Sequence, residues 1–205
     1  MPASLDGPRR APVRLAELPD EELVALSKQG DEAAFGEFVR RHTGAVHRWM
    51  ARSVGEQEAE DMTQEVFLKA YRGLARFRGE APPRAWLASI ADNAVKNRYR
   101  ARGRFRRIFS DSADSARHSE PPAIGADPEE RATAGQSRHF IAEALRRLPV
   151  AFRMPVVLRD LEEWSYEDIS VSLRLPVGTV KSRIARGRAQ LRTLLLPLLN
   201  SGKAL

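Results

Sequence analysis

The stretch 165–192 constrains the fold most, because it holds two helical patterns separated by a short break. In the first pattern, Ser165 can cap a helix and Asp168 follows three residues later, as in a capping box. The break falls at Arg174-Leu175-Pro176, and proline suits a helix start, where its missing N–H is not needed. The second pattern has apolar residues at helical spacing, namely Val180, Ile184 and Leu191. The stretch therefore predicts two helices joined by a tight turn.

The opposite side of the second helix combines small and basic residues, namely Lys181, Ser182, Ala185, Arg186 and Ala189. The small residues allow the helix to approach a surface closely, and the basic ones place hydrogen-bond donors at its edges. After Asp168 the sequence has seven Lys or Arg and no acidic residue. This pattern is typical of a helix-turn-helix whose second helix lies in the major groove of DNA. An amphipathic helix with a solvated basic face is the alternative interpretation.

The composition favours a polyanionic partner, because Lys plus Arg number 34 and Asp plus Glu 27, which gives a net charge of +7. The length of 205 residues allows one large or two small domains. The absence of cysteine excludes disulfides and thiolate catalysis and is typical of proteins in a reducing cytosol. No apolar run is long enough to span a membrane, so we expect a cytoplasmic protein without direct membrane insertion.

The sequence contains none of the common signatures of catalysis or cofactor binding. There is no P-loop, nucleophile elbow or dinucleotide fingerprint. His42 and His47 are five residues apart, so they do not share a helix face as a metal-binding pair four apart would. We therefore expect no enzyme activity, no catalytic residue, no metal, no cofactor and no small-molecule substrate.

Helical patterns follow a Pro-rich, charged stretch, 1–17, which we expect to be a disordered leader. Asp20 and Asp31 can each cap a helix, and the two helices would end at Gly30 and Gly55.

The next predicted helix, 56–77, has two apolar sides, which indicates that it packs between neighbouring helices. The remaining side carries Asp61, Gln64, Glu65 and Leu68. That side is either an ordinary solvated surface or a contact surface for another molecule.

A loop with basic and aromatic residues, 76–83, precedes a further helix that starts near Arg84 and extends into the segment 97–107. Six arginines lie between Arg98 and Arg107, interleaved with Tyr99 and Phe105. Basic residues bind phosphates, and aromatic rings offer faces on which unpaired bases stack. A solvated basic helix end is the alternative interpretation.

The segment 110–135 is rich in Ser, Ala, Pro and Asp, with six acidic residues, two arginines and no periodicity. This composition predicts a flexible acidic linker between two helical modules. The second module opens with helices through Phe140 and from Pro149, the latter burying Leu161 among others, and continues into the helix-turn-helix. Pro155 should kink the helix from Pro149.

Both modules resemble the bacterial RNA polymerase sigma factors of the extracytoplasmic function (ECF) group. AEDMTQEVFLKAYRGLARFRGE (59–80) and WLASIADNAVKNRYR (86–100) are similar to the second half of sigma region 2. LRRLPVAFRMPVVLRDLEEWSYEDISVSLRLPVGTVKSRIARGRAQLR (145–192) is similar to sigma region 4. The resemblance implies an all-α fold of two small helical domains joined by a flexible linker. We expect a leader at 1–17, region 2 at 18–108, the linker at 109–135, region 4 at 136–196 and a tail at 197–205.

The resemblance also implies partners and contact residues. Core RNA polymerase would be bound through its β′ clamp and β flap, with the clamp contacted by Asp61, Gln64, Glu65 and Leu68. The −10 promoter element would be held open as a single strand by Arg76, Phe77, Arg78, Asn93, Lys96, Asn97, Arg98 and Arg100. The −35 element would be read as duplex by Thr179, Lys181, Ser182, Arg183 and Arg186, in the helix-turn-helix 165–188. An anti-sigma factor, often membrane-bound in this group, is a further expected partner.

Four features depart from the family pattern. Arg174 stands where glycine is usual in the turn, so the turn must accommodate a side chain. Pro82-Pro83 replaces a segment that usually contains Ser and Phe, and Asp92 and Asn97 replace the commoner Arg and Asp.

The expected function is that of a sigma factor that recruits core polymerase to promoters and melts them. A stand-alone helix-turn-helix regulator is the alternative, although it would not need residues 59–107. A basic amphipathic protein of membrane surfaces is a third hypothesis, but the basic helices lack the Trp, Phe and Leu face that such binding requires.

Overall fold

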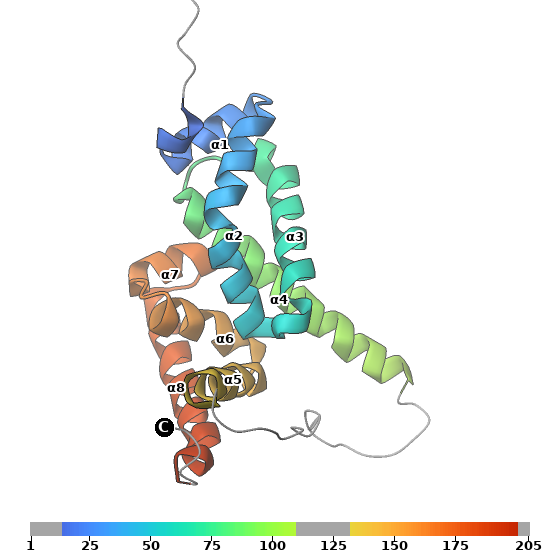
Figure 1. The fold of residues 1–205 in the computed structure, drawn as a ribbon, viewed down its shortest axis with the longest axis vertical. Helices are drawn as coiled ribbons and strands as arrows, with labels where there is room; N and C mark the ends of the chain where they lie inside the picture. The colour runs from blue at the N-terminus through green and yellow to red at the C-terminus, as the bar shows by residue number, and fades with distance from the viewer. Residues whose placement is uncertain (1–13, 110–131, 201–205) are drawn as a thin grey trace, which may run out of the picture.

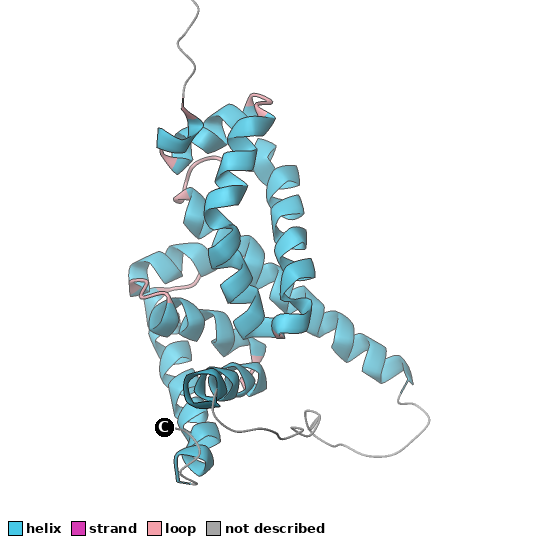
Figure 2. Cartoon of the chain, viewed as in Figure 1, coloured by secondary structure: helices cyan, strands magenta, loops and turns pink. Residues whose placement is uncertain are grey.

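The computed structural model describes residues 14–109 and 132–200, and every regular element in these ranges is a helix (Figure 2). The N-terminal module comprises η1 (Leu15–Glu17), α1 (Asp20–Lys28), α2 (Glu32–Val54), α3 (Glu56–Gly73), η2 (Leu74–Arg76) and α4 (Pro83–Phe109). The C-terminal module comprises α5 (Ala132–Arg147), α6 (Val150–Val156), η3 (Val157–Leu161), α7 (Tyr166–Leu173) and α8 (Val177–Asn200). The expected all-α fold is confirmed.

Local signals in the sequence set most of the helix ends. Asp31 accepts a hydrogen bond from the Ala34 backbone N–H at 3.0 Å, as an N-cap does. Gly55 ends α2 with a φ of 101°, a conformation that glycine adopts without steric cost. The predicted cap at Asp20 is wrong, because Pro19 occupies the N-cap position and makes no side-chain cap. The Asp20 carboxylate instead pairs with Arg41 and His42 of α2.

The end of the predicted leader is tied to α2 by Arg41. Its guanidinium donates hydrogen bonds to the backbone carbonyls of Leu15, Ala16 and Leu18 at 2.6–2.9 Å. Residues 14–17 therefore have structure, including η1, where the sequence predicted disorder. The rest of that stretch, 1–13, lies outside the described residues.

The core of the N-terminal module lies where the four helices meet. Large buried side chains on these helices include Leu23, Phe38, Trp49, Met50, Val66 and Leu87. Helix α3 packs against both α2 and α4, which confirms that it lies between neighbours. The third predicted side of α3 is exposed to solvent. The helix itself ends at Gly73, four residues earlier than predicted, and η2 completes the segment.

The C-terminal module contains a distorted second helix, as the proline predicted. Pro155 lies within α6, and η3 continues from it as a π-helical turn. Met154, Val157 and Leu158 are buried on this segment. The expectation that Leu161 is buried is wrong, because its side chain is 36% exposed at the end of η3.

The predicted linker 109–135 overlaps two helices at its ends. Helix α4 reaches Phe109 and α5 already begins at Ala132, while 110–131 lie outside the described residues. Helix α8 extends to Asn200, into the segment predicted as a tail. Within the described ranges, no helix combines the length and apolarity needed to cross a membrane.

The two modules pack directly against each other (Figure 1). Helix α7 lies along α4, and α5 and α6 contact α2, while the C-terminal part of α4 projects away from both modules. One core cluster therefore includes buried side chains from both modules, such as Trp49 and Trp164, whose rings meet edge to face at 5.8 Å.

Candidate nucleic-acid interface

Helix α7 begins as the capping pattern predicts, and a short turn joins it to α8. Ser165 accepts a hydrogen bond from the Asp168 backbone N–H at 3.0 Å, and its hydroxyl donates to the Asp168 carboxylate. Arg174 takes a left-handed conformation with φ 52°, which a side chain tolerates less readily than glycine does. The Pro176 carbonyl accepts from Thr179 and Val180, so Pro176 lies just before the first helical residue of α8.

The exposed side of α8 is the small and basic side that the sequence predicts. Lys181, Ser182 and Arg186 are exposed, while Val180 and Ile184 on the opposite side are buried. Thr179 and Arg183 are half-buried. The Lys181 ammonium lies 5.4 Å from the centre of the Tyr166 ring. The charge of Arg183 reaches Asp92 of α4 and offsets a small part of the burial that raises the pKa of that carboxyl.

Gly187 is an important residue of α8 that the sequence analysis missed. A Cβ at this position would lie 2.6 Å from Cγ2 of Val156, which is buried in α6. The missing side chain therefore allows α8 to pack closely on α6 and places the exposed side of α8. A glycine on the buried side of a predicted helix, seven residues after Val180, was the available signal.

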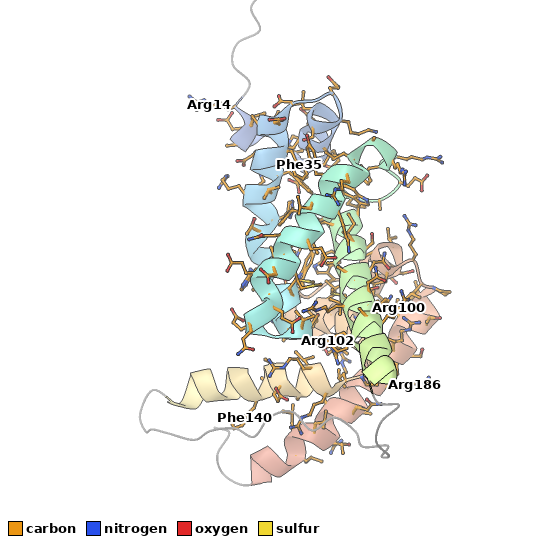
Figure 3. The ribbon with its side chains drawn as sticks, turned by 90° about the vertical axis from the view of Figure 1, so that its right-hand side faces the viewer. Arg14, Phe35, Arg100, Arg102, Phe140 and Arg186 are labelled. Carbon is orange, nitrogen blue, oxygen red and sulfur yellow. The ribbon has the colours of Figure 1, made fainter. Side chains whose placement is uncertain are left out.

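Arg98, Arg100 and Arg102 of α4 are exposed and Lys96 is half-buried, and carboxylates hold three of these four cations. Arg98 and Arg102 both pair with Glu58 of α3, the former at 2.7 Å. Lys96 pairs with Asp92 one turn earlier on α4. Asn93, Asn97 and Arg100 are exposed, and Arg100 donates to the Asn97 side-chain oxygen at 2.9 Å. Figure 3 shows Arg100 and Arg102 along α4, and Arg186 on the C-terminal module.

Tyr99 and Phe105 of α4 were both expected to offer rings for stacking on unpaired bases. Tyr99 is half-buried, and the Arg153 guanidinium covers its ring at 4.1 Å, so the ring is not free to stack on bases. The side chain of Phe105, and those of the later arginines, lie outside the described residues.

Asp92 is buried among charged neighbours. Burial raises the pKa of its carboxyl above the ordinary value of 3.8, although the Lys96 hydrogen bond and the charges of Lys96 and Arg183 lower it in part. Its side chain is buried, so it is not exposed on the surface of α4 that carries the candidate contacts.

The loop before α4 combines an aromatic stack with exposed arginines. The rings of Phe77 and Trp86 lie 4.6 Å apart, and Lys28 donates to the Phe77 carbonyl at 2.8 Å. Arg76 and Arg78 are exposed. An open pocket of about 400 Å³ lies between this loop and α1, and Val24, Phe77, Arg78, Pro82 and Pro83 are among its lining residues. A pocket of this kind can hold an extruded base.

The third side of α3 is an exposed surface of mixed character. Asp61, Gln64, Glu65 and Leu68 are all exposed, and 57% of Leu68 is accessible. Tyr71 is 49% exposed, although the centre of its ring lies 5.1 Å from that of Phe35. The exposed side of α3 therefore combines two apolar side chains with three polar ones.

Comparison with known proteins accounts for both modules. The family model for sigma-70 region 2 matches residues 38–105, and that for sigma-70 region 4 matches residues 141–191. The chain is 34% identical to the ECF RNA polymerase sigma-E factor of Haemophilus influenzae, over 89% of this chain and 98% of that protein.

Two solved structures are similar in fold. CnrH in complex with the cytosolic domain of CnrY has a TM-score of 0.59 and 29% identity, covering 86% of this chain and 96% of that one. The sigma factor RpoE in complex with the anti-sigma factor NepR from Bartonella quintana has a TM-score of 0.59 and 26% identity, covering 78% and 96%. The chain therefore belongs to the sigma-70 family, within the ECF group of RNA polymerase sigma factors.

Proposed function

We propose that the protein is a dissociable specificity subunit of RNA polymerase that binds the core enzyme, selects promoters and melts them. The observation that carries the proposal is that both family regions present an exposed basic helix, α4 in the first and α8 in the second. The protein acts in the cytoplasm and is not itself a catalyst.

Recognition of the −35 element is assigned to the exposed side of α8. Arg186 and Lys181 can bind base edges or phosphates, and the small neighbours allow close approach in the major groove. Ser182, Thr179 and Arg183 complete the proposed contact set.

Binding of the −10 element is assigned to α4 and the loop before it. Arg76, Phe77 and Arg78 border the loop pocket or lie next to it, where an extruded base could stack. Four exposed residues of α4, namely Asn93, Asn97, Arg98 and Arg100, and the half-buried Lys96 would hold the single strand.

The core-binding surface is proposed to be the exposed side of α3, with Asp61, Gln64, Glu65 and Leu68 against the β′ clamp. Region 4 would bind the β flap. An anti-sigma factor is a further proposed partner, which is supported by the similar sigma factor RpoE, solved with the anti-sigma factor NepR. The proposed boundaries are 18–108 for region 2 and 136–196 for region 4, with 109–135 between them.

The deciding experiment is run-off transcription with core polymerase, with and without the protein. A promoter-specific transcript only when the protein is present is the expected result. Tight operator binding without any effect on core polymerase would instead support a stand-alone regulator. The family match to region 2 argues against that alternative, because a regulator needs only the helix-turn-helix.

The core-binding surface can be tested with a matched pair of double variants. Asp61→Ala with Gln64→Ala should weaken the binding of core polymerase, because both side chains are exposed on the proposed surface. Gln29→Ala with Glu32→Ala removes the same two chemical groups, at the same spacing, from exposed positions outside α3. Equal pull-down of core polymerase by the two double variants would remove the assignment.

A further inference from the structure

One side of α1 forms a wall of the pocket beside the loop that precedes α4, 76–83, which we call the −10 loop. The α1 residues that line the pocket recur at helical spacing and share one face of the helix: Glu21, Val24, Ala25 and Lys28. Loop residues from Phe77 onward form the opposite wall. None of the −10 contacts predicted from the sequence lies on α1, so this wall is a part of the pocket without an assigned role.

Lys28 connects the two walls of the pocket through a hydrogen bond. It is the last residue of α1, and its ammonium donates to the Phe77 backbone carbonyl at 2.8 Å, across 49 residues of sequence. A cation in the last turn of a helix is also stabilised by the helix dipole. Among residues 14–109 and 132–200, no carboxylate forms an ion pair with Lys28. Its hydrogen-bonding partner there is the carbonyl of the loop and not an acid.

Phe77 is fixed through its N–H, its ring and its carbonyl. The backbone N–H donates to the Leu74 carbonyl at 3.0 Å, which closes η2. The ring packs against that of Trp86 in the first turn of α4. These two contacts lie within the segment that carries the −10 loop, whereas the Lys28 hydrogen bond ties that segment to α1.

The loop beyond Phe77 has few hydrogen bonds of its own. Gly79 has a φ of 75°, a left-handed conformation that glycine adopts without steric cost. The loop ends where the Pro82 carbonyl accepts from the Trp86 N–H at 3.0 Å, at the start of α4. Within the part of the chain that the structure describes, residues 78–81 form no backbone hydrogen bond. The anchoring of Phe77 therefore sets where the loop wall begins.

Helix α1 is a firm support for Lys28. Its side chains Leu23 and Val24 are buried in the core, and Asp20 in its first turn pairs with Arg41 of α2. A pocket binds more tightly when its walls are fixed before the ligand arrives, because ordering a wall at the moment of binding costs affinity. The hydrogen bond from Lys28 supplies this pre-organisation to the loop wall.

We propose that Lys28 is a positioning residue that fixes the −10 loop, through the Phe77 carbonyl, in the conformation that holds an extruded base. The inference rests on the proposed function for the identity of the ligand, but the restraint on the loop exists in the free protein and can be measured there. A lysine that instead contacted a DNA phosphate would add affinity on every strand, whatever base it carried. The two roles therefore give different patterns of loss.

The first experiment measures the mobility of the loop in the free full-length chain. The sequence has no cysteine, so Glu80→Cys gives a single exposed site in the loop for a nitroxide spin label. Lys28→Met removes the donor, and its electron paramagnetic resonance spectrum should show a more mobile label. Lys28→Arg retains a donor and should keep the label restrained. Lys69→Met is the matched control, because it makes the same chemical change on α3, outside the pocket.

The second experiment measures how the holoenzyme, assembled with core polymerase, binds the single −10 strand of a promoter found by run-off transcription. The probes are the intact strand and strands with an abasic site at each position in turn. If one base is held in the pocket, one abasic position weakens wild-type binding most. Lys28→Met should bind the intact strand about threefold to tenfold more weakly, which is the effect of one hydrogen bond. It should bind the strand that is abasic at that position as well as the wild type does.

Each result of the two experiments either supports the proposal or overturns it. It is overturned if Lys28→Met leaves the label as restrained as Lys69→Met does, or if Lys28→Arg is as mobile as Lys28→Met. An equal loss of affinity on intact and abasic strands would also overturn it, and would identify a phosphate contact. A loop that Lys28→Met loosens, in a chain that never forms a holoenzyme, would contradict the proposed function and leave the restraint by Lys28 intact.

Discussion

The two basic helices, α4 and α8, differ in how their cations are held. On α4, Lys96, Arg98 and Arg102 each form an ion pair with a carboxylate of the N-terminal module. On α8, Arg188 pairs with Asp160, but Arg186 has no such partner among the described residues, and Lys181 contacts only an aromatic ring. Arg186 and Lys181 of α8 are therefore ready for phosphates or bases, whereas Lys96, Arg98 and Arg102 of α4 must exchange one partner for another.

This difference indicates that the helices contribute to DNA binding in different ways. A free exposed cation that neutralises a phosphate releases a counterion and adds salt-dependent affinity. A cation that leaves a carboxylate for a phosphate gains less, because part of its interaction existed before binding. We expect α8 to provide most of the charge-driven affinity, and α4 to contribute mainly after the strands separate.

The largest expected effect is that of Arg186→Ala on binding to −35 duplex DNA. The change should cost about 1–3 kcal/mol if the guanidinium contacts base edges, and it should relax base preference at one position. Fluorescence anisotropy with a promoter duplex and a scrambled duplex distinguishes a contact to base edges from a contact to a phosphate. An equal loss on both, with a smaller salt slope, would identify a phosphate contact.

Arg98→Ala is the counterpart on α4. It should cost less binding free energy than Arg186→Ala does, at most about 1 kcal/mol on forked −10 DNA. The reason is that Glu58 already binds this arginine. Losses of the same size for both variants would contradict the comparison of the two helices.

Gly187→Ala should damage the placement of α8 and leave α4 intact. The new methyl group would meet buried Val156, and overpacking outweighs the better helix propensity of alanine, so we expect about 1–2 kcal/mol of lost stability. Urea unfolding measures this loss. The variant should lose more affinity for −35 duplex DNA than for single-stranded −10 DNA. A stability equal to that of the wild type would show that α6 moves aside at no cost.

Glu58→Gln should strengthen binding of single-stranded −10 DNA, by about 0.2–1 kcal/mol, because it releases Arg98 and Arg102. Glu60→Gln is the control, since Glu60 is an exposed acid of the same helix and the change in net charge is identical. If both variants bind equally well, the gain reflects net charge alone, and the ion pairs do not restrain these arginines.

Asp92→Asn is expected to have the smallest effect, a slight stabilisation at neutral pH. Burial raises the pKa of Asp92 in the folded chain, so its ionised form carries a cost above that pKa which asparagine does not. The advantage of the variant should shrink as the pH falls through the raised pKa, and vanish below the ordinary value of 3.8. Thermal unfolding from pH 3 to 8 measures the difference. A variant less stable at pH 7 would mean that the Lys96 pair outweighs the burial.

Local patterns in the sequence determined the helices and much of the candidate site. Hydrophobic spacing predicted which side of α8 is exposed, and Ser165 and Asp31 predicted two caps, because both signals act within a few residues. The exposed acidic side of α3 followed from the same periodicity. The predicted cap at Asp20 was wrong, because distant residues of α2, Arg41 and His42, engage that carboxylate instead.

Only the tertiary structure decided which charges are free and which are held. Glu162 and Arg52 are 110 residues apart, and Ser53 and Arg153 are 100 apart, so no helical period connects them. The structure also differs from the sequence-based prediction at Tyr99 and Leu161, because a residue's exposure depends on which module packs over it. Periodicity reports the side of a helix that is buried, but not the partner that covers it, because that choice is made by contacts between distant segments.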